Sequence, residues 1–181
     1  LASAGALYYS HRQYDLARRY YKTMVTKFPE SQQRTIGLLS LMNSYFFLGK
    51  FNDAEFVARK IVDLPDIPPD QAEVARKRIG ESIYKNAEKM EQEEKYLEAA
   101  QEFFRVYTDA SYYKEIVDLA LLNSARNYEL NKEWKQAINM YDTLVVNYEQ
   151  SQYRLIALGK IAEAYKQMED FNGVCASFER I

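Results

Sequence analysis

The first clear pattern in the chain is the spacing of its hydrophobic positions, which recur every three or four residues. From Tyr14 they fall at positions 14, 17, 21, 24, 25 and 28, the spacing of a helix that buries one face. Pro29 then stops the helix, because proline lacks the amide hydrogen, and Ser31 is the expected N-cap of the next one. The pattern predicts one helix over residues 14–28 and another from Ser31.

The same spacing predicts helices along the whole chain. Gly49 supplies the left-handed turn that ends one of them. Three of the four prolines lie in the connector LPDIPPD, residues 64–70, and the helix after it is about two turns longer than its counterparts. The predicted helices cover residues 1–11, 14–28, 31–48, 51–62, 70–93, 96–107, 111–130, 134–148, 151–168 and 171–181.

These helices repeat in pairs around an aromatic residue in the turn between them. The turn aromatics are separated by 37, 45, 38 and 37 residues, and self-similarity at such a period predicts a solenoid of stacked units. The turn aromatics are Tyr14, Phe51, Tyr96, Trp134 and Phe171. Six residues before each lies a key residue, namely Tyr8, Tyr45, Met90, Tyr128 or Tyr165. The units span approximately residues 1–29, 31–64, 69–109, 111–148 and 151–181.

Further positions recur in phase with the turn aromatic. Three residues after it comes Ala17, Ala54, Ala99, Ala137 or Val174, and four beyond that a ring in four of the five units. This pattern resembles the tetratricopeptide repeat, in which small residues let two helices approach closely and aromatics fill the gap between units. The resemblance implies an all-α, right-handed superhelical solenoid of about five antiparallel helix pairs. It also implies a non-enzymatic scaffold that binds a protein or peptide.

The joints between units indicate a narrower group. FPES at residues 28–31 and YEQS at residues 148–151 are similar to the aromatic-Pro-x-Ser joints of BamD-type outer-membrane assembly lipoproteins and Tol-Pal-associated periplasmic proteins. That resemblance implies a place in a bacterial envelope assembly, in the periplasm or cell envelope. Because the chain begins at Leu1 and neither end carries a polar outer face, we expect a fragment of a longer solenoid.

The resemblance also selects the residues expected to line a concave groove. They occupy slots around the key residue on the first helix of each pair, with Tyr84 added six residues before Met90. The predicted groove residues are Asn43, Phe46, Phe47, Tyr84, Glu88, Glu91, Arg126, Glu129, Glu163 and Lys166. A ligand would place an aromatic or aliphatic anchor near Phe46 and Phe47 and a basic residue near Glu88 and Glu91. Packing of Phe46 and Phe47 against the next helix is the alternative.

Composition narrows the classes of partner. Lys and Arg number 24 against 26 Asp and Glu, so the chain lacks the positive charge that nucleic-acid binding requires. No apolar run approaches the roughly 20 residues of a membrane span, and we expect no membrane insertion by this segment. The alternative to a groove is a structural role, in which unsealed apolar ends let the chain self-associate.

Candidate catalytic and metal-binding residues are few. His11 is the only histidine and occupies a turn slot, and Cys175, the only cysteine, lies far from it in sequence. The acidic run EKMEQEEK at residues 88–95 has no calcium-loop spacing, and no glycine-rich phosphate loop is present. The sequence therefore predicts no enzyme, no metal and no cofactor.

Overall fold

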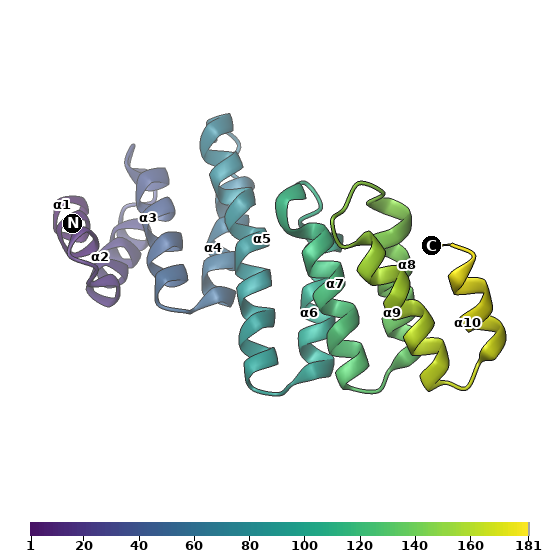
Figure 1. The fold of residues 1–181 in the computed structure, drawn as a ribbon. Helices are drawn as coiled ribbons and strands as arrows, with labels where there is room; N and C mark the ends of the chain where they lie inside the picture. Colours follow the sequence, from purple (N-terminus) through teal and green to yellow (C-terminus); the bar gives the residue numbers. More distant parts are fainter. Residues whose placement is uncertain (181) are drawn as a thin grey trace. The chain divides into compact units, whose positions relative to one another are not determined.

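The computed structural model describes residues 1–180. These residues form ten α-helices and no strand (Figure 1), which confirms the predicted all-helical fold. The helices are α1 (Ala2–Ser10), α2 (Tyr14–Lys27), α3 (Arg34–Phe47), α4 (Phe51–Val62), α5 (Pro69–Gln92), α6 (Tyr96–Asp109), α7 (Lys114–Leu130), α8 (Trp134–Asn147), α9 (Arg154–Gln167) and α10 (Phe171–Phe178).

The helices pack in two compact units, and the boundary between them falls within α5. We call them the N-terminal unit, Leu1–Ile83, and the C-terminal unit, which begins at Tyr84. In the N-terminal unit α1 packs on α2, α2 on α3 and α3 on α4, while in the C-terminal unit each helix from α6 to α9 packs on the next. The right-handed array of all five pairs stays a prediction.

The turn inside each helix pair has the same backbone geometry in all five pairs. The amide just before the turn aromatic donates to the carbonyl of the key residue, over 2.8–3.0 Å. Two residues before the turn aromatic the backbone has a positive φ of 57° to 68°, at Arg12, Gly49, Glu94, Lys132 and Glu169. Glycine adopts this conformation without a steric cost, so the left-handed turn predicted at Gly49 is confirmed. The repeat is therefore visible in the backbone as well as in the sequence.

The recurring small residue is buried in four of the five helix pairs. Ala17, Ala54, Ala99 and Ala137 are fully buried. Four residues further along, the rings of Phe103 and Tyr141 are also fully buried. Because protein interiors are close-packed, a larger side chain at the alanine positions would push the helices apart.

Helix α5 is the longest element among the described residues. It has 24 residues against 14 in α3, which confirms the longer helix expected after the proline-rich connector. Pro69 is its first residue, where proline is tolerated because the amide hydrogen would have no partner in the helix.

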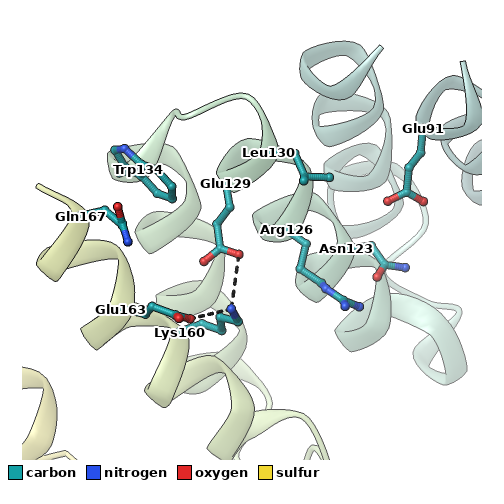
Figure 2. A pocket seen from close by; sticks show the side chains of 9 residues that line it. All are labelled: Glu91, Asn123, Arg126, Glu129, Leu130, Trp134, Lys160, Glu163 and Gln167. Carbon is teal, nitrogen blue, oxygen red and sulfur yellow. Dashed lines mark hydrogen bonds and ion pairs between the residues drawn. The ribbon is translucent and has the colours of Figure 1, made fainter. Parts of the chain in front are cut away.

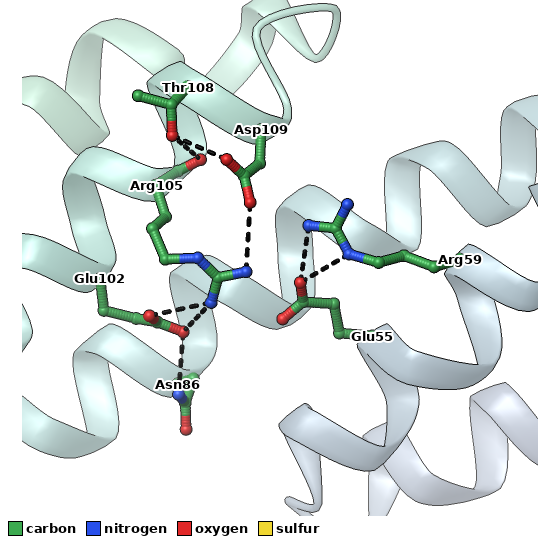
Figure 3. A network of polar contacts seen from close by, with 7 residues as sticks. All are labelled: Glu55, Arg59, Asn86, Glu102, Arg105, Thr108 and Asp109. Atoms are coloured by element: carbon green, nitrogen blue, oxygen red, sulfur yellow. Dashed lines mark hydrogen bonds and ion pairs between the residues drawn. The ribbon is translucent and has the colours of Figure 1, made fainter.

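Polar contacts fasten the C-terminal half of α5 to α6 (Figure 3). Asn86 donates to Glu102 over 2.9 Å, and Arg105 donates to the same carboxylate and to Asp109 over 3.0 and 3.2 Å. Glu102 is a buried carboxylate, and these donors satisfy it. In the N-terminal unit the buried Glu55 is paired within its own helix, with Arg59 at 2.7 Å.

The expected helix starts at Ser31 and Ser151 are wrong. Helices α3 and α9 begin three residues later, at Arg34 and Arg154, and Ser31 is not an N-cap. The hydroxyl of Ser31 accepts instead from the amide of Gln33, two residues on, and that of Ser151 accepts from the amide of Tyr153. Each serine therefore closes a turn that precedes the helix.

Candidate partner-binding site

A pocket of about 590 Å³ opens among the first helices of the C-terminal unit (Figure 2). The lining residues of α7 are three or four positions apart, which places their side chains on one face of the helix. The lining residues of α9 have the same spacing. The residues that line the pocket are Glu91, Asn123, Arg126, Glu129, Leu130, Trp134, Lys160, Glu163 and Gln167. The predicted groove residues Glu91, Arg126, Glu129 and Glu163 are thus brought together, although their role in binding stays a prediction.

Lys160 joins the two carboxylates on one wall of this pocket. Its Nζ atom donates to Glu163 over 2.6 Å and lies 4.0 Å from the carboxylate of Glu129. The hydrogen bond from Lys160 lowers the pKa of Glu163. Lys160 and Glu163 are therefore paired with each other, and Glu129 lies at the edge of ion-pair distance.

Glu129 is more buried than Glu163. Burial raises the pKa of Glu129, and the charge of Lys160 only partly opposes this rise. Behind it lies Tyr141, whose side chain is fully buried and whose pKa is raised first by burial and then by the charge of Glu129. The Tyr141 hydroxyl has no hydrogen bond of standard geometry among the described residues. The base of this wall is consequently a costly place for negative charge.

Arg126 and Leu130 form the opposite face of the pocket. Arg126 is exposed and makes no ion pair or hydrogen bond with another described residue, and Leu130 is 55% exposed one turn further along α7. Glu91, by contrast, accepts from Asn127 over 2.9 Å. Of the charged groups in the described pocket, Arg126 retains the most unused hydrogen-bonding capacity, since a guanidinium carries five donors. A carboxylate beside an apolar side chain matches this face chemically.

The other predicted residues of the C-terminal unit do not line the pocket. Tyr84 is held by Asn123, which donates to its hydroxyl over 2.8 Å, and burial raises the pKa of Tyr84 to about 12. Glu88 pairs with Lys85 at 2.6 Å, so the carboxylate expected to meet a basic ligand is already paired. Lys166 is exposed on α9 outside the pocket lining.

Two predicted groove residues of the N-terminal unit, Phe46 and Phe47, belong to an aromatic cluster on α1–α4. We call Tyr9, Tyr14, Phe46, Phe47 and Phe51 the aromatic shelf. Phe47 stacks on Tyr14 with ring centroids 4.9 Å apart, and Phe46 meets Phe51 edge to face at 5.4 Å. The guanidinium of Arg78 lies 4.0 Å from the centre of the Phe46 ring. The rings of the shelf therefore pack mainly on one another and on Arg78.

Phe46 and Phe47 differ in how much of each side chain is exposed to solvent. Phe46 is half-buried beneath Arg78, as the packing alternative expects, whereas Phe47 is 50% exposed. Asn43, one turn earlier on α3, is half-buried. Its side-chain amide oxygen, Oδ1, is buried and has no hydrogen-bond partner among the described residues. Of the two phenylalanines, Phe47 is thus the more available to a ligand.

The slots around the key residue also predict Leu130 and Gln167 as groove residues, so sequence reasoning missed three of the nine lining residues. Asn123 and Lys160 lie three residues before Arg126 and Glu163, so helical periodicity alone would have placed them on the same face. Trp134 was assigned only to the turn, but its half-buried ring also forms part of the pocket wall. The helical spacing was therefore sufficient to predict Asn123 and Lys160 as lining residues.

The described residues offer little for other kinds of site. No group of three or more His, Cys, Asp or Glu side chains within residues 1–180 is placed to hold a metal ion. Both His11 and Cys175 are exposed. Among the helices that the structure describes, none combines the length and the apolar character that crossing a membrane requires.

Comparison with known proteins adds a family match for parts of the chain. The model of the family described as tetratricopeptide repeat matches residues 4–31 and 119–151, about a third of the chain. The first stretch contains most of α1 and all of α2, and the second contains most of α7 and all of α8. These two helix pairs therefore have the sequence character of tetratricopeptide repeats.

Solved structures and curated proteins add less. The nearly identical TPR-like repeats of a protein described as a kinesin light chain from Podosopora anserina are 15% identical, with a TM-score of 0.39 over 99% of this chain and 93% of that one. A point variant of those repeats is 14% identical, also with a TM-score of 0.39, over 99% and 90%. Such scores are too low to establish a common arrangement of the helices. No curated protein matches the chain.

Proposed function

We propose that this chain is a non-enzymatic scaffold that binds a segment of a partner protein along its first helices. Tetratricopeptide repeats generally mediate protein–protein interaction, and two helix pairs match that family. The observation that carries the proposal is the pocket on α5, α7 and α9, where Arg126 has no partner among the described residues and Leu130 is exposed beside it.

The chemistry of the pocket favours one kind of segment. A carboxylate of the ligand pairs with Arg126, and an aliphatic or aromatic side chain next to it covers Leu130. Lys160 competes poorly for that carboxylate because Glu163 and Glu129 already engage it. The preferred ligand is therefore a peptide in which an acidic residue adjoins an apolar one.

Selection from a library of random displayed peptides on the 181-residue chain tests this proposal. We expect enrichment of acidic residues next to apolar ones. We also expect Arg126→Glu to weaken binding of the selected peptides by about tenfold or more, since it replaces an attraction with a repulsion. Circular dichroism should show unchanged helicity, because Arg126 is exposed.

The matched control is Lys114→Glu, which reverses an exposed charge on the same helix outside the pocket. Binding of the selected peptides should be unchanged by this substitution. Equal affinity of the parent and the Arg126→Glu variant, or an equal loss in both variants, contradicts the proposed site.

We further propose that the scaffold serves a bacterial envelope assembly. The joints FPES and YEQS, at residues 28–31 and 148–151, support this assignment through their similarity to envelope proteins. Fractionation of the native host tests it. Recovery of the protein with the periplasm or envelope supports the assignment, and recovery with the cytoplasm contradicts it.

A further inference from the structure

The pocket on α5, α7 and α9 contains more carboxylates than cations. Its charged lining residues are three carboxylates and two cations, namely Glu91, Glu129, Glu163, Arg126 and Lys160. One cation, Lys160, already donates to Glu163 over 2.6 Å. A ligand carboxylate that pairs with Arg126 therefore brings a further negative charge into a site where carboxylates are in excess. Like charges that share one site disfavour the ionised form of each other.

Glu129 is the carboxylate on the α7–α9 wall that is least suited to stay ionised when this charge arrives. Its side chain is 16% exposed, whereas that of Glu163 is 57% exposed. The Nζ atom of Lys160 lies 4.0 Å from Glu129, beyond the 2.6 Å of its contact with Glu163. Burial raises the pKa of Glu129 before any ligand is present, whereas the hydrogen bond from Lys160 lowers the pKa of Glu163. Added negative charge should therefore protonate Glu129 first.

Charged and titratable groups on three helices act on Glu129. On α7, Arg126 lies three residues earlier, and its charge favours the ionised form of Glu129, as does that of Lys160 on α9. Glu163 on α9 opposes it. A ligand carboxylate on Arg126 offsets one of the two cations that keep Glu129 charged. The balance at Glu129 then shifts toward the neutral form.

Tyr141 of α8 favours the same outcome. Its hydroxyl interacts with Glu129 but makes no hydrogen bond of standard geometry among the described residues. A carboxylate can only accept a hydrogen bond, whereas a neutral carboxyl group can also donate one. Protonation of Glu129 therefore supplies the buried Tyr141 oxygen with a donor.

We propose that Glu129 takes up one proton from solvent when an acidic ligand pairs with Arg126, so that binding to this pocket strengthens as the pH falls. The proton returns to solvent when the ligand leaves. This inference rests on the proposed function, because it requires the ligand carboxylate at Arg126. Proton binding and ligand binding then favour each other by the same factor, as any two coupled binding events must.

Calorimetric titration of a selected acidic peptide into the 181-residue chain tests the coupling. We expect the affinity to be about fivefold or more higher near pH 5.5 than near pH 8, since the acid of the peptide, with an ordinary pKa of about 4, stays ionised at both. Titrations in two buffers of different ionisation enthalpy give the number of protons taken up. Between these pH values, uptake should rise above zero and remain at or below one proton per peptide.

Glu129→Gln should remove both effects, because the amide is neutral at every pH. The affinity of this variant should no longer change between the two pH values, and its proton uptake should fall to zero. The matched control is Glu115→Gln, the same substitution at an exposed position of α7 outside the pocket. It should keep the affinity, the pH dependence and the proton uptake of the parent.

Carbon NMR titration of the Glu129 carboxyl group in the parent chain gives a second measurement that needs no variant. Its pKa should be higher with the peptide bound than without it. An unchanged pKa, or a parent affinity that does not vary with pH, overturns the inference. If Arg126→Glu still weakens binding in that case, the proposed function stands alone. If Arg126→Glu has no effect on binding, the proposed function fails and the inference fails with it.

Discussion

The aromatic shelf of the N-terminal unit and the charged pocket of the C-terminal unit occupy equivalent first-helix positions but reach opposite states. In the shelf, rings stack on rings and Arg78 covers Phe46, so most of the groove-side surface is already in contact. In the pocket, Arg126 makes no hydrogen bond or ion pair with another described residue, and Leu130 is 55% exposed. The repeat fixes the positions of these side chains along the first helices. Their chemistry decides whether they pack on one another or remain accessible to a ligand.

The largest expected effect on stability comes from substituting the buried alanines that recur in both units. Ala137→Arg and Ala54→Arg each put a long charged chain where the side chain is fully buried. We expect each to destabilise its own unit by about 3 kcal/mol or more, because neither the volume nor the charge can be accommodated. Thermal melting followed by circular dichroism measures this.

The control for the C-terminal unit is Gln136→Arg, which adds the same side chain at the exposed neighbouring position. Its melting temperature should remain close to that of the parent. If Ala137→Arg melted at the same temperature as Gln136→Arg, the alanine would not mark a close helix contact.

A smaller effect should separate the two phenylalanines of the shelf. Phe46→Ala removes a half-buried ring that packs on Phe51 and under Arg78, and we expect a loss of about 2 kcal/mol. Phe47→Ala should cost less, because half of that ring is exposed. Urea denaturation of the two variants gives the comparison. Equal losses would show that Phe47 is as much a packing residue as Phe46.

The smallest effect distinguishes the two carboxylates that share Lys160. Burial raises the pKa of Glu129 in the folded protein, so stability from its protonated form is present below its ordinary value of 4.5 and is lost as pH rises through the folded pKa. Glu129→Gln mimics the neutral form and should raise the melting temperature at neutral pH. That gain should disappear in acid, below the ordinary pKa.

Glu163 should behave in the opposite way. Its pKa is lowered by Lys160, so its stabilising contribution is present above 4.5 and is lost as pH falls through the folded pKa. Glu163→Gln should therefore lower the melting temperature slightly at neutral pH, since the pair is largely exposed and screened. Shifts of the same sign in both variants would show that the two carboxylates experience similar surroundings.

Much of the fold follows from local sequence signals. The turn aromatics and the small residues three positions later predict the helix pairs, and Gly49 predicts its left-handed turn. The serines at 31 and 151 misled because a hydroxyl can close a turn as readily as it caps a helix. That choice depends on the backbone before the helix, which residue type alone does not fix.

The candidate site is less accessible from sequence. The spacing brings Arg126, Glu129 and Glu163 toward one surface, but the approach of Lys160 on α9 to Glu129 on α7 depends on how the two helices pack. The cover that Arg78 provides over Phe46 likewise requires α5 to lie beside α3. Such contacts join residues more than 30 positions apart, and no local pattern specifies them.

Hydrogen exchange of the C-terminal unit, with and without a selected acidic peptide, tests the central claim most directly. Binding along the first helices should slow amide exchange in α7 and α9, around residues 123–130 and 160–167, and leave the outer turns of α6 and α8 unchanged. Protection confined to α6 and α8, with α7 and α9 unaffected, would contradict it.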